Sequence, residues 1–292
     1  IESMSVMKDA ASSAVYGASA ANGIIVVTTK KGKQGKMRIN YTFDGQYNTP
    51  LVKRDKLNSY EYATMHNAIS DYMGEAKPYS EIVLAKILSG EFNDYPNTDW
   101  WNTLVKKGAF SQRHTLTLDG GSEDTQYRMS FSVYDQGSLQ KHVAGSNSPL
   151  DYKTYSADLK LTHFWRKAGV KMSFDVRPYL VDNKSYGNAS VFNNSTGVQQ
   201  LSPLDKVYNS DGSYAPGSPV AAYADTDGSY AKKFNFGTDL NLSLDWDIKW
   251  IKGLKAVFWG NYRLGSSRDK YWTRNVPTYN EDGTQVTTTS PK

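Results

Sequence analysis

Phe234–Asp247 reads FNFGTDLNLSLDWD, and the alternation of this stretch decides the fold class. Successive side chains of a β-strand point to opposite faces, so a period of two separates an apolar face from a polar one. One face of this stretch carries apolar side chains, namely Phe234, Phe236, Leu240, Leu242, Leu244 and Trp246. The other carries Asn235, Asp239, Asn241, Ser243, Asp245 and Asp247. The stretch therefore predicts a long strand with one apolar and one charged face.

The same alternation recurs along most of the chain. Six further stretches show it, and they are Tyr41–Asn48, Gln112–Asp119, Tyr127–Asp135, Tyr155–His163, Val170–Leu180 and Leu254–Leu264. In the last of these, Val257 and Trp259 blur the pattern. Most of the stretches exceed the roughly 5–6 residues of an ordinary strand. We therefore expect an all-β protein with about seven long strands.

The connections between these stretches alternate in length. Long loops follow the first, third and fifth strands, whereas short turns close the other pairs at Gly120–Asp124, Phe164–Gly169 and Ile248–Gly253. Aromatic residues cluster beside two of these turns, at Phe164, Trp165, Trp246 and Trp250. Short turns at one end, long loops at the other and an aromatic girdle are typical of an outer-membrane β-barrel. A secreted β-sandwich alternates as well and is the alternative.

The long loops carry structure of their own. Tyr60–Tyr72 is expected to form a helix with Ser59 as its N-cap, and Ser80–Leu88 a second helix. A short helix is expected at Asp9–Val15, and a buried strand at Ile24–Thr29. Asp-Gly pairs favour tight turns within the later loops, at Asp211–Gly212, Asp227–Gly228 and Asp282–Gly283.

Composition excludes several kinds of chemistry. The chain has no cysteine, so a disulfide scaffold and a thiolate nucleophile are excluded. Its net charge is +5, and the densest basic run, Lys30–Lys36, favours a solvated linker over nucleic-acid contact. No nucleophile elbow or phosphate loop is present. The histidines His66, His114, His142 and His163 lack metal-ligand spacing. Calcium binding at Asp225 and Asp227 is an alternative to a plain turn in this loop, but the glutamate that ends an EF-hand loop is missing. We expect neither an enzyme nor a metal or other cofactor.

Residues 7–32 read MKDAASSAVYGASAANGIIVVTTKKG. The KDA, YG, ANG and TTKKG motifs in this segment resemble the end of the plug domain in SusC-like (RagA-like) TonB-dependent outer-membrane transporters. Further matches follow in order, at Leu57–Tyr62 (LNSYEY), Pro96–Trp101 (PNTDWW), Phe110–Gly121 (FSQRHTLTLDGG) and Gln136–Leu139 (QGSL). The resemblance is close over residues 1–180 and looser beyond them.

The resemblance implies part of a 22-stranded antiparallel transmembrane β-barrel that encloses a plug. Residues 1–35 would end the plug, and 36–292 would form about seven strands, with extracellular loops at 50–107, 136–152, 182–232 and 266–292. The first loop would contain the helices. The plug motif would be structural, at Lys8, Asp9, Tyr16, Gly17, Asn22 and Gly23. Because the chain opens at Ile1 and stops in a Thr/Ser/Pro stretch, we expect it to be a segment of a longer protein.

The function implied by the resemblance is active import across the outer membrane of a Bacteroidota-type bacterium. TonB, with ExbB and ExbD, would supply the energy, and a SusD-like surface lipoprotein would deliver the ligand. The resemblance also allows a dimer of transporter–lid pairs. Oligosaccharide is the expected ligand and oligopeptide the alternative within the family. The rivals from other classes are a secreted polysaccharide-binding β-sandwich and an outer-membrane enzyme. Aromatic loop residues could stack on sugars, and the candidates are Trp100, Trp101, Tyr186, Phe192, Tyr208 and Tyr214.

Overall fold

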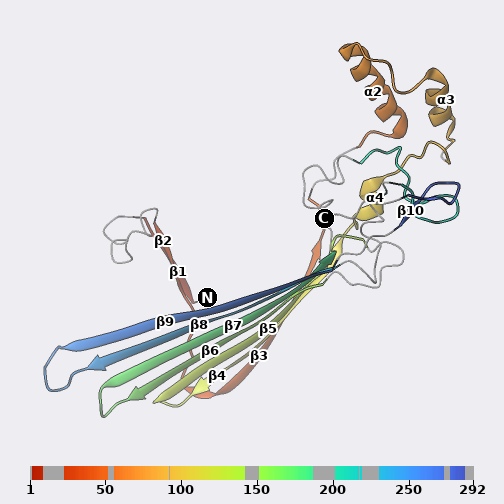
Figure 1. Ribbon diagram of the computed structural model, residues 1–292. Coiled ribbons are helices and arrows are strands. Elements are labelled where there is room, and N and C mark those ends of the chain that lie inside the picture. The colour runs from red at the N-terminus through yellow and green to blue at the C-terminus, as the bar shows by residue number, and fades with distance from the viewer. Residues whose placement is uncertain are drawn as a thin grey trace.

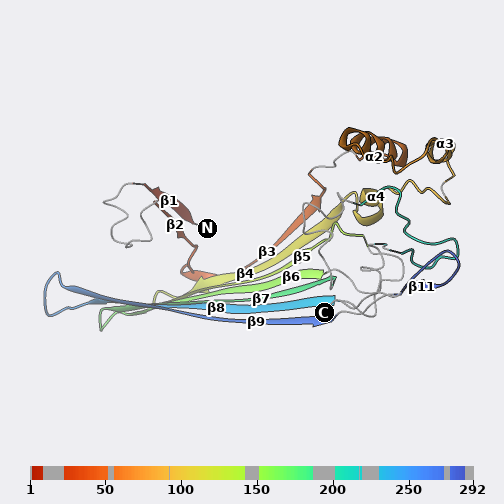
Figure 2. The ribbon, with the colours of Figure 1, turned by 45° about the horizontal axis from the view of Figure 1, so that its top comes forward.

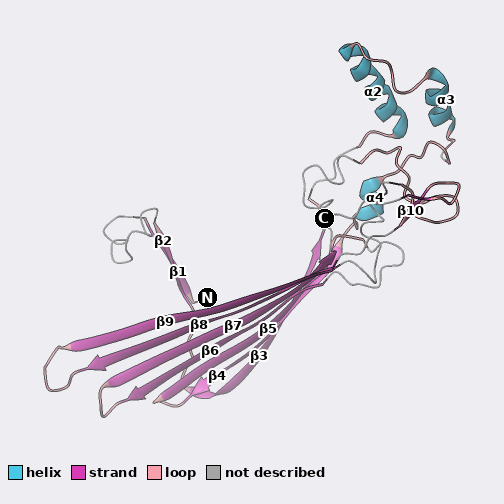
Figure 3. Ribbon diagram, in the orientation of Figure 1, coloured by secondary structure: helices cyan, strands magenta, loops and turns pink. Residues whose placement is uncertain are grey.

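A single antiparallel sheet dominates the computed structural model of the chain (Figure 1). The structure describes residues 2–8, 23–51, 56–91, 93–141, 151–186, 201–216, 218, 230–272 and 277–286. Seven strands pair in chain order: β3 (Gly35–Asn48), β4 (Ala109–Gly121), β5 (Thr125–Gln136), β6 (Asp151–Trp165), β7 (Val170–Tyr186), β8 (Tyr230–Asp247) and β9 (Lys255–Trp272). This up-and-down order, coloured magenta in Figure 3, confirms the predicted all-β architecture.

The strand register places apolar and polar side chains on opposite faces of the sheet. Phe174 pairs with Leu242, and the preceding Ser173 pairs with Ser243. The same division runs from β3 to β9. Apolar-face residues stay open, because Phe131 is 45% exposed and Phe174 39% exposed. In the described part of the chain, no second sheet packs against this face, as the β-sandwich alternative would require.

The strands continue into ranges that were expected to be loops. β7 runs on to Tyr186, β8 begins at Tyr230 and β9 ends at Trp272, whereas the resemblance implied extracellular loops at 182–232 and 266–292. Likewise β6 begins at Asp151, inside the range 136–152. The reason is chemical: near the loop end both faces carry charged residues, so the apolar alternation stops before the backbone pairing stops. Backbone hydrogen bonds do not depend on side-chain polarity.

β9 explains the blurred pattern near its start. Val257 pairs with Asp245 and Trp259 with Ser243, so both lie on the polar face of the sheet. Val257 is 58% exposed there and Trp259 74% exposed. Val257 and Trp259 therefore form an apolar patch on the polar face, near the turn Ile248–Gly253.

A small hairpin precedes the sheet. β1 (Ser3–Met7) pairs antiparallel with β2 (Ile24–Thr28), and Figure 2 shows the pair above the concave face of the curved sheet. The sequence predicted a buried strand here, but Ile25 is 62% exposed, since the described residues place only β1 beside it. The helix expected at Asp9–Val15 lies outside the described residues.

Three helices occupy the long β3–β4 connection at one end of the sheet (Figure 1): α2 (Ser59–Met73), α3 (Glu81–Ser89) and α4 (Trp100–Leu104). Asn58, not Ser59, is the N-cap of α2, because its Oδ1 accepts from the Glu61 N–H at 2.9 Å while Glu61 Oε2 accepts from the Asn58 N–H. Ser80 caps α3. None of the helices in the described ranges is long and apolar enough to cross a membrane.

Candidate functional site: a charged inner face and a loop platform

The polar face of the sheet carries an ordered set of ion pairs. Arg38 on β3 donates through Nε to Asp119 Oδ2 on β4 at 3.1 Å, and Arg128 on β5 lies 3.5 Å from the other oxygen of that carboxylate. Asp119 is only 9% exposed. A carboxylate withdrawn from water needs such partners, because an unpaired buried charge is very costly.

The ion pairs continue across the remaining strands. Lys160 lies 3.6 Å from Asp158 on β6, and Arg263 on β9 donates to Asp239 on β8 at 2.5 Å. Together these groups form a charge belt that reaches from β3 to β9. Its members are Arg38, Asp119, Arg128, Asp158, Lys160, Asp175, Arg177, Asp239 and Arg263. The belt makes this face a polar wall.

The segment that follows β2 is fixed to this wall. The Lys160 ammonium donates to the Thr29 hydroxyl and, at 3.4 Å, to the Lys30 carbonyl. Gly32 packs directly on β5, since a Cβ there would lie 2.4 Å from the Tyr127 carbonyl oxygen. These contacts place the hairpin on the polar face, and they show why a glycine ends the TTKKG motif.

The long loops pack together into one unit, which we call the loop platform. It contains α4, residues 201–216 and the small hairpin of β10 (Thr278–Tyr279) and β11 (Gln285–Val286). Thr98 N–H donates to the Pro203 carbonyl at 2.8 Å, and Tyr279 N–H donates to the Tyr214 carbonyl at 2.9 Å. Three connections that are distant in sequence thus form one surface at the same end of the sheet (Figure 1).

Trp100 forms the centre of the loop platform. Its side chain is 1% exposed, and its indole N–H donates to the Ser202 carbonyl at 2.7 Å. Of the aromatic ligand candidates, Trp100 therefore packs loops together. Trp101 and Tyr214 are half-buried nearby, and the rings of Tyr208 and Tyr214 lie 5.3 Å apart.

A cleft of about 270 Å³ opens on the platform. Tyr208 lines it and is 37% exposed, and burial raises the pKa of its phenol. Asn209 and the Lys206–Glu281 ion pair line the same cleft. The hydrogen bond from Lys206 is the main cause that lowers the pKa of Glu281. An aromatic face beside amide and charged groups suits a ligand with hydroxyl or amide groups.

Sequence reasoning missed Lys206, Asn209 and Glu281, although the nearby Asp-Gly signals could have located them. Asp211–Gly212 turns the chain between the bridged Tyr208 and Tyr214, and Asp282–Gly283 turns it between β10 and β11. Both glycines have positive φ, 84° and 79°. Two of the three predicted turns are therefore confirmed, and Asp227–Gly228 lies outside the described residues.

The other predicted site residues are scattered. Tyr186 ends β7, and its side chain, like all of Phe192, lies outside the described part. Of the plug motif, Lys8 and Gly23 are described, and Gly23 has φ +92° with a Cβ position 3.0 Å from the Met7 carbonyl oxygen. The structure does not describe the remaining members, Asp9, Tyr16, Gly17 and Asn22.

The described ranges contain no cluster of metal-ligand side chains. Among those residues, no three His, Asp or Glu side chains come together as a metal site. Asp225 and Asp227, the calcium alternative, lie outside the described residues. The histidines that are described serve other contacts: His114 bonds Tyr41 at 2.6 Å, and His163 bonds Thr125 at 2.7 Å.

Comparison with known proteins gives sequence relatives and a common fold. No family model matches the chain. It is 25% identical over 215 residues to the TonB-dependent receptor SusC of Bacteroides thetaiotaomicron, a match that covers 73% of this chain and 19% of that protein. The TonB-dependent receptor P3 of Formosa agariphila is 27% identical over 223 residues, again with 73% and 19% covered. The chain thus spans about a fifth of the length of these relatives.

Solved structures share the fold. The RagAB peptide importer in its closed-closed state superposes with a TM-score of 0.68 at 18% identity, covering 91% of this chain and 32% of that chain. Its open-open state gives a TM-score of 0.65 at 20% identity, with the same coverage. None of these proteins is named as an enzyme. The sequence matches make this chain a homologue of the TonB-dependent receptors SusC and P3, and it shares the fold of the RagAB importer.

Proposed function

We propose that this chain forms the end of the plug and part of the barrel wall of a TonB-dependent importer in the outer membrane. The observation that carries the proposal is the two-faced sheet, with an open apolar face on one side and the Lys160–Thr29 contact holding the hairpin segment on the other. We assign residues 1–35 to the plug and 36–292 to the barrel. The start of β3 at Gly35 supports that boundary.

The height of the apolar face fits a bilayer. On β7 the band runs from Val170, which pairs with Trp246, to Leu180, which pairs with Phe236. That length is about 33 Å along a strand, or about 25 Å across the membrane at a tilt of about 40°. The apolar band of an outer-membrane barrel is also about 25 Å tall. In the described sheet β3 and β9 are open edges, and further strands pairing there would close the barrel.

Import would use the two ends of the sheet differently. A SusD-like lipoprotein would rest on the loop platform and deliver ligand from outside the cell. TonB, driven by ExbB and ExbD, would then remodel the plug and release segment 29–33 from the charge belt. No covalent chemistry is required of the chain. Pairs of importer and lid would further assemble as dimers.

Oligosaccharide is the ligand class we propose. The platform cleft combines the half-exposed Tyr208 ring with the Lys206–Glu281 ion pair, and aromatic faces pack against sugar C–H groups while polar groups meet hydroxyls. The relationship to SusC adds support. Oligopeptide is the second candidate, favoured by the structural match to an importer named for peptides.

The test is ligand binding by the full-length importer with its lid, measured by calorimetry against mixed oligosaccharides and mixed oligopeptides. We expect heat of binding with oligosaccharides, and Tyr208→Ala should weaken it about tenfold. Tyr72→Ala is the control, because Tyr72 is 93% exposed on α2 and does not line the cleft. Binding of peptides alone would select the second candidate. Binding of neither ligand would overturn the proposal of import for both classes.

A further inference from the structure

A row of lysines crosses three neighbouring strands where the apolar band ends. Lys184 on β7 pairs with Lys232 on β8, and Lys232 pairs with Lys270 on β9. Their positions place them on the apolar face, four residues beyond Leu180 and Phe236. Arg268 lies on the same face one row nearer the band, opposite Phe234. We call Lys184, Lys232, Lys270 and Arg268 the cationic row.

The cationic row is short of negative charge within the described residues. Like charges directly opposite each other across strands destabilise a sheet, and here three lysines stand side by side. Asp182 is the acid that reaches the row, 3.9 Å from Lys232. At the β6 end, Asp151 is the register partner of Lys184. Asp269 instead contacts Lys233 on the opposite face. Four cations therefore outnumber their acidic neighbours on β7–β9.

Aromatic rings hold the lysines at the edge of the band. The Lys232 ammonium lies 4.4 Å from the centre of the Phe234 ring, and the Lys270 ammonium lies 5.6 Å from that of Tyr230. Lysine stems of this kind lie along apolar surface while their charged ends stay at the water boundary. The next row of the same face includes Tyr230 and Trp272, aromatic residues of the type that marks a membrane interface.

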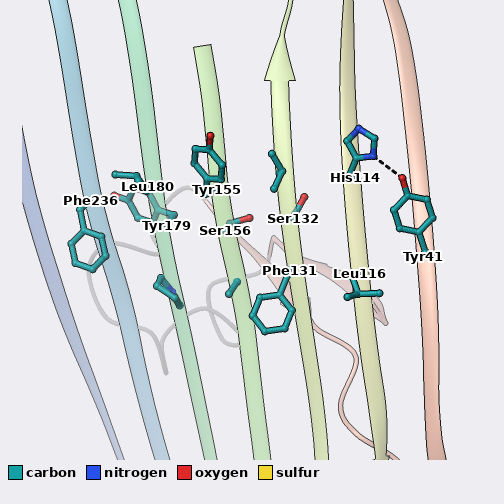
Figure 4. A pocket seen from close by; sticks show the side chains of 13 residues that line it. Tyr41, His114, Leu116, Phe131, Ser132, Tyr155, Ser156, Tyr179, Leu180 and Phe236 are labelled. Atoms are coloured by element: carbon teal, nitrogen blue, oxygen red, sulfur yellow. Dashed lines mark hydrogen bonds between the residues drawn. The ribbon is translucent and has the colours of Figure 1, made fainter. Parts of the chain in front are cut away.

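An apolar groove lies on the same face, and its nearer end, at Leu180 and Phe236, is four residues from Lys184 and Lys232. It has a volume of about 460 Å³, and its lining includes Ala157 and Pro178, which stand opposite each other where the β6–β7 ladder lacks two pairs. Larger side chains flank this strip, and Figure 4 shows Phe131, Tyr155, Leu180 and Phe236 from four adjacent strands. Leu180 and Phe236 also belong to the strands that carry Lys184 and Lys232. A groove of this shape fits a hydrocarbon chain.

We propose that the cationic row and the groove together bind a membrane lipid with a phosphate-bearing headgroup. The phosphates would neutralise the lysine row, and an acyl chain would fill the groove. Charge complementarity selects this occupant over a neutral lipid, because phosphate would add acceptor oxygens to the one carboxylate, Asp182, that reaches Lys232. The inference rests on the proposed function, since it needs the apolar face to lie in the membrane's outer leaflet.

The test compares lipid retention by the full-length protein in detergent. Native mass spectrometry would count bound lipid A carrying two phosphates and, separately, the same lipid after phosphate removal. The test variant is Lys184→Gln/Lys232→Gln/Lys270→Gln. The matched control is Lys233→Gln, because Lys233 adjoins Lys232 in sequence but faces the polar side of the sheet.

We expect the triple variant to bind the phosphorylated lipid about 100-fold more weakly, since each lysine near an anionic lipid surface contributes about fivefold. Lys233→Gln should bind it as the wild-type protein does, and raised salt should reproduce the loss. Equal retention of the phosphate-free lipid, or an unchanged triple variant, would overturn the inference. Neither result would touch the proposed function, which fails separately if the full-length protein stays in solution without detergent.

Discussion

Lys160 and Thr29 are joined by a hydrogen bond from the β6 ammonium to the hydroxyl of the segment that follows β2. The same ammonium reaches the Lys30 carbonyl at 3.4 Å, and Lys160 is 10% exposed. One side chain of the wall thus holds the point where the hairpin segment meets the sheet. Because the contact is polar, breaking it disrupts no apolar core.

The first prediction concerns this contact. Lys160→Met should free residues 29–33, because the variant keeps the aliphatic stem and removes the ammonium that donates to Thr29 and Lys30. Amide hydrogen exchange in that segment should become about tenfold faster. Lys171→Met is the control, since Lys171 lies on the same face and pairs with Asp245 at 3.7 Å, away from the segment. Unchanged exchange in the Lys160 variant would show that this contact does not hold the segment on the sheet.

The second prediction concerns the loop platform. Trp100→Phe removes the indole donor to the Ser202 carbonyl and should destabilise the platform by about 1–2 kcal/mol. Trp100→Ala should cost about 3–5 kcal/mol, because it also empties a fully buried site. Hydrogen exchange over 201–216 would measure both effects. Trp101→Phe, at a half-buried neighbour, should leave the exchange nearly unchanged.

The third prediction is a pH dependence of the platform. The pKa of Glu281 is lowered, chiefly by the hydrogen bond from Lys206, so the ionised form is favoured when folded. The contribution of Glu281 to the stability of the platform is therefore present at neutral pH. It is lost as the pH falls below 4.5, the ordinary pKa of a glutamate. Asp205 has the opposite effect on the stability of the platform, because burial raises its pKa and so favours its protonated form in the folded state.

Comparison with Glu281→Gln isolates the glutamate. Exchange over 205–216, corrected for the intrinsic rate, should speed up between pH 6 and pH 3.5 in the wild-type protein and change less in the variant. Glu75→Gln, at an acid outside the platform, should keep the wild-type profile. An acid response of equal size in Glu281→Gln would show that other groups cause it.

The fourth prediction compares the two faces at one level of the sheet. Leu242→Lys places a charge in the middle of the apolar band and should destabilise the folded barrel by about 2–4 kcal/mol. Ser243→Lys, one residue along on the polar face, should have little effect. The fraction folded in lipid vesicles, measured from heat-modifiable gel migration, would report both. Similar losses at both positions would contradict the assignment of the faces.

The sequence alone predicted the sheet well, because strand alternation is a local signal. Phe234–Asp247 alternates with a period of two, and the neighbouring stretches repeat it, so the order and faces of the strands followed. The strand ends did not, since charged residues such as Asp182 and Lys232 lie on the apolar face beyond the apolar band and hide the continued pairing. The N-cap was misplaced by one residue for a related reason: Asn58 and Ser59 are both good caps, and the reciprocal bond of Glu61 selects Asn58.

The platform was less predictable, because it depends on contacts between distant loops. Nothing local in the sequence brings Glu281 to Lys206, or Ser202 to Trp100. A tryptophan in a loop looks the same in sequence whether it packs inside or faces a ligand. Only the Asp-Gly turns carried local information about this unit.

The central claim is that the apolar face contacts lipid while the opposite face lines an aqueous interior. This chain contains no cysteine, so single cysteines for spin labels can be introduced at residues 239 to 244 of β8, with any cysteine elsewhere in the full-length protein replaced before it is reconstituted in lipid. Labels at Leu240, Leu242 and Leu244 should be relaxed by oxygen dissolved in the bilayer, and labels at Asp239, Asn241 and Ser243 by a water-soluble nickel complex. An alternating profile with a period of two is the predicted result. Uniform accessibility, or protection of the leucine positions from both reagents, would contradict the account.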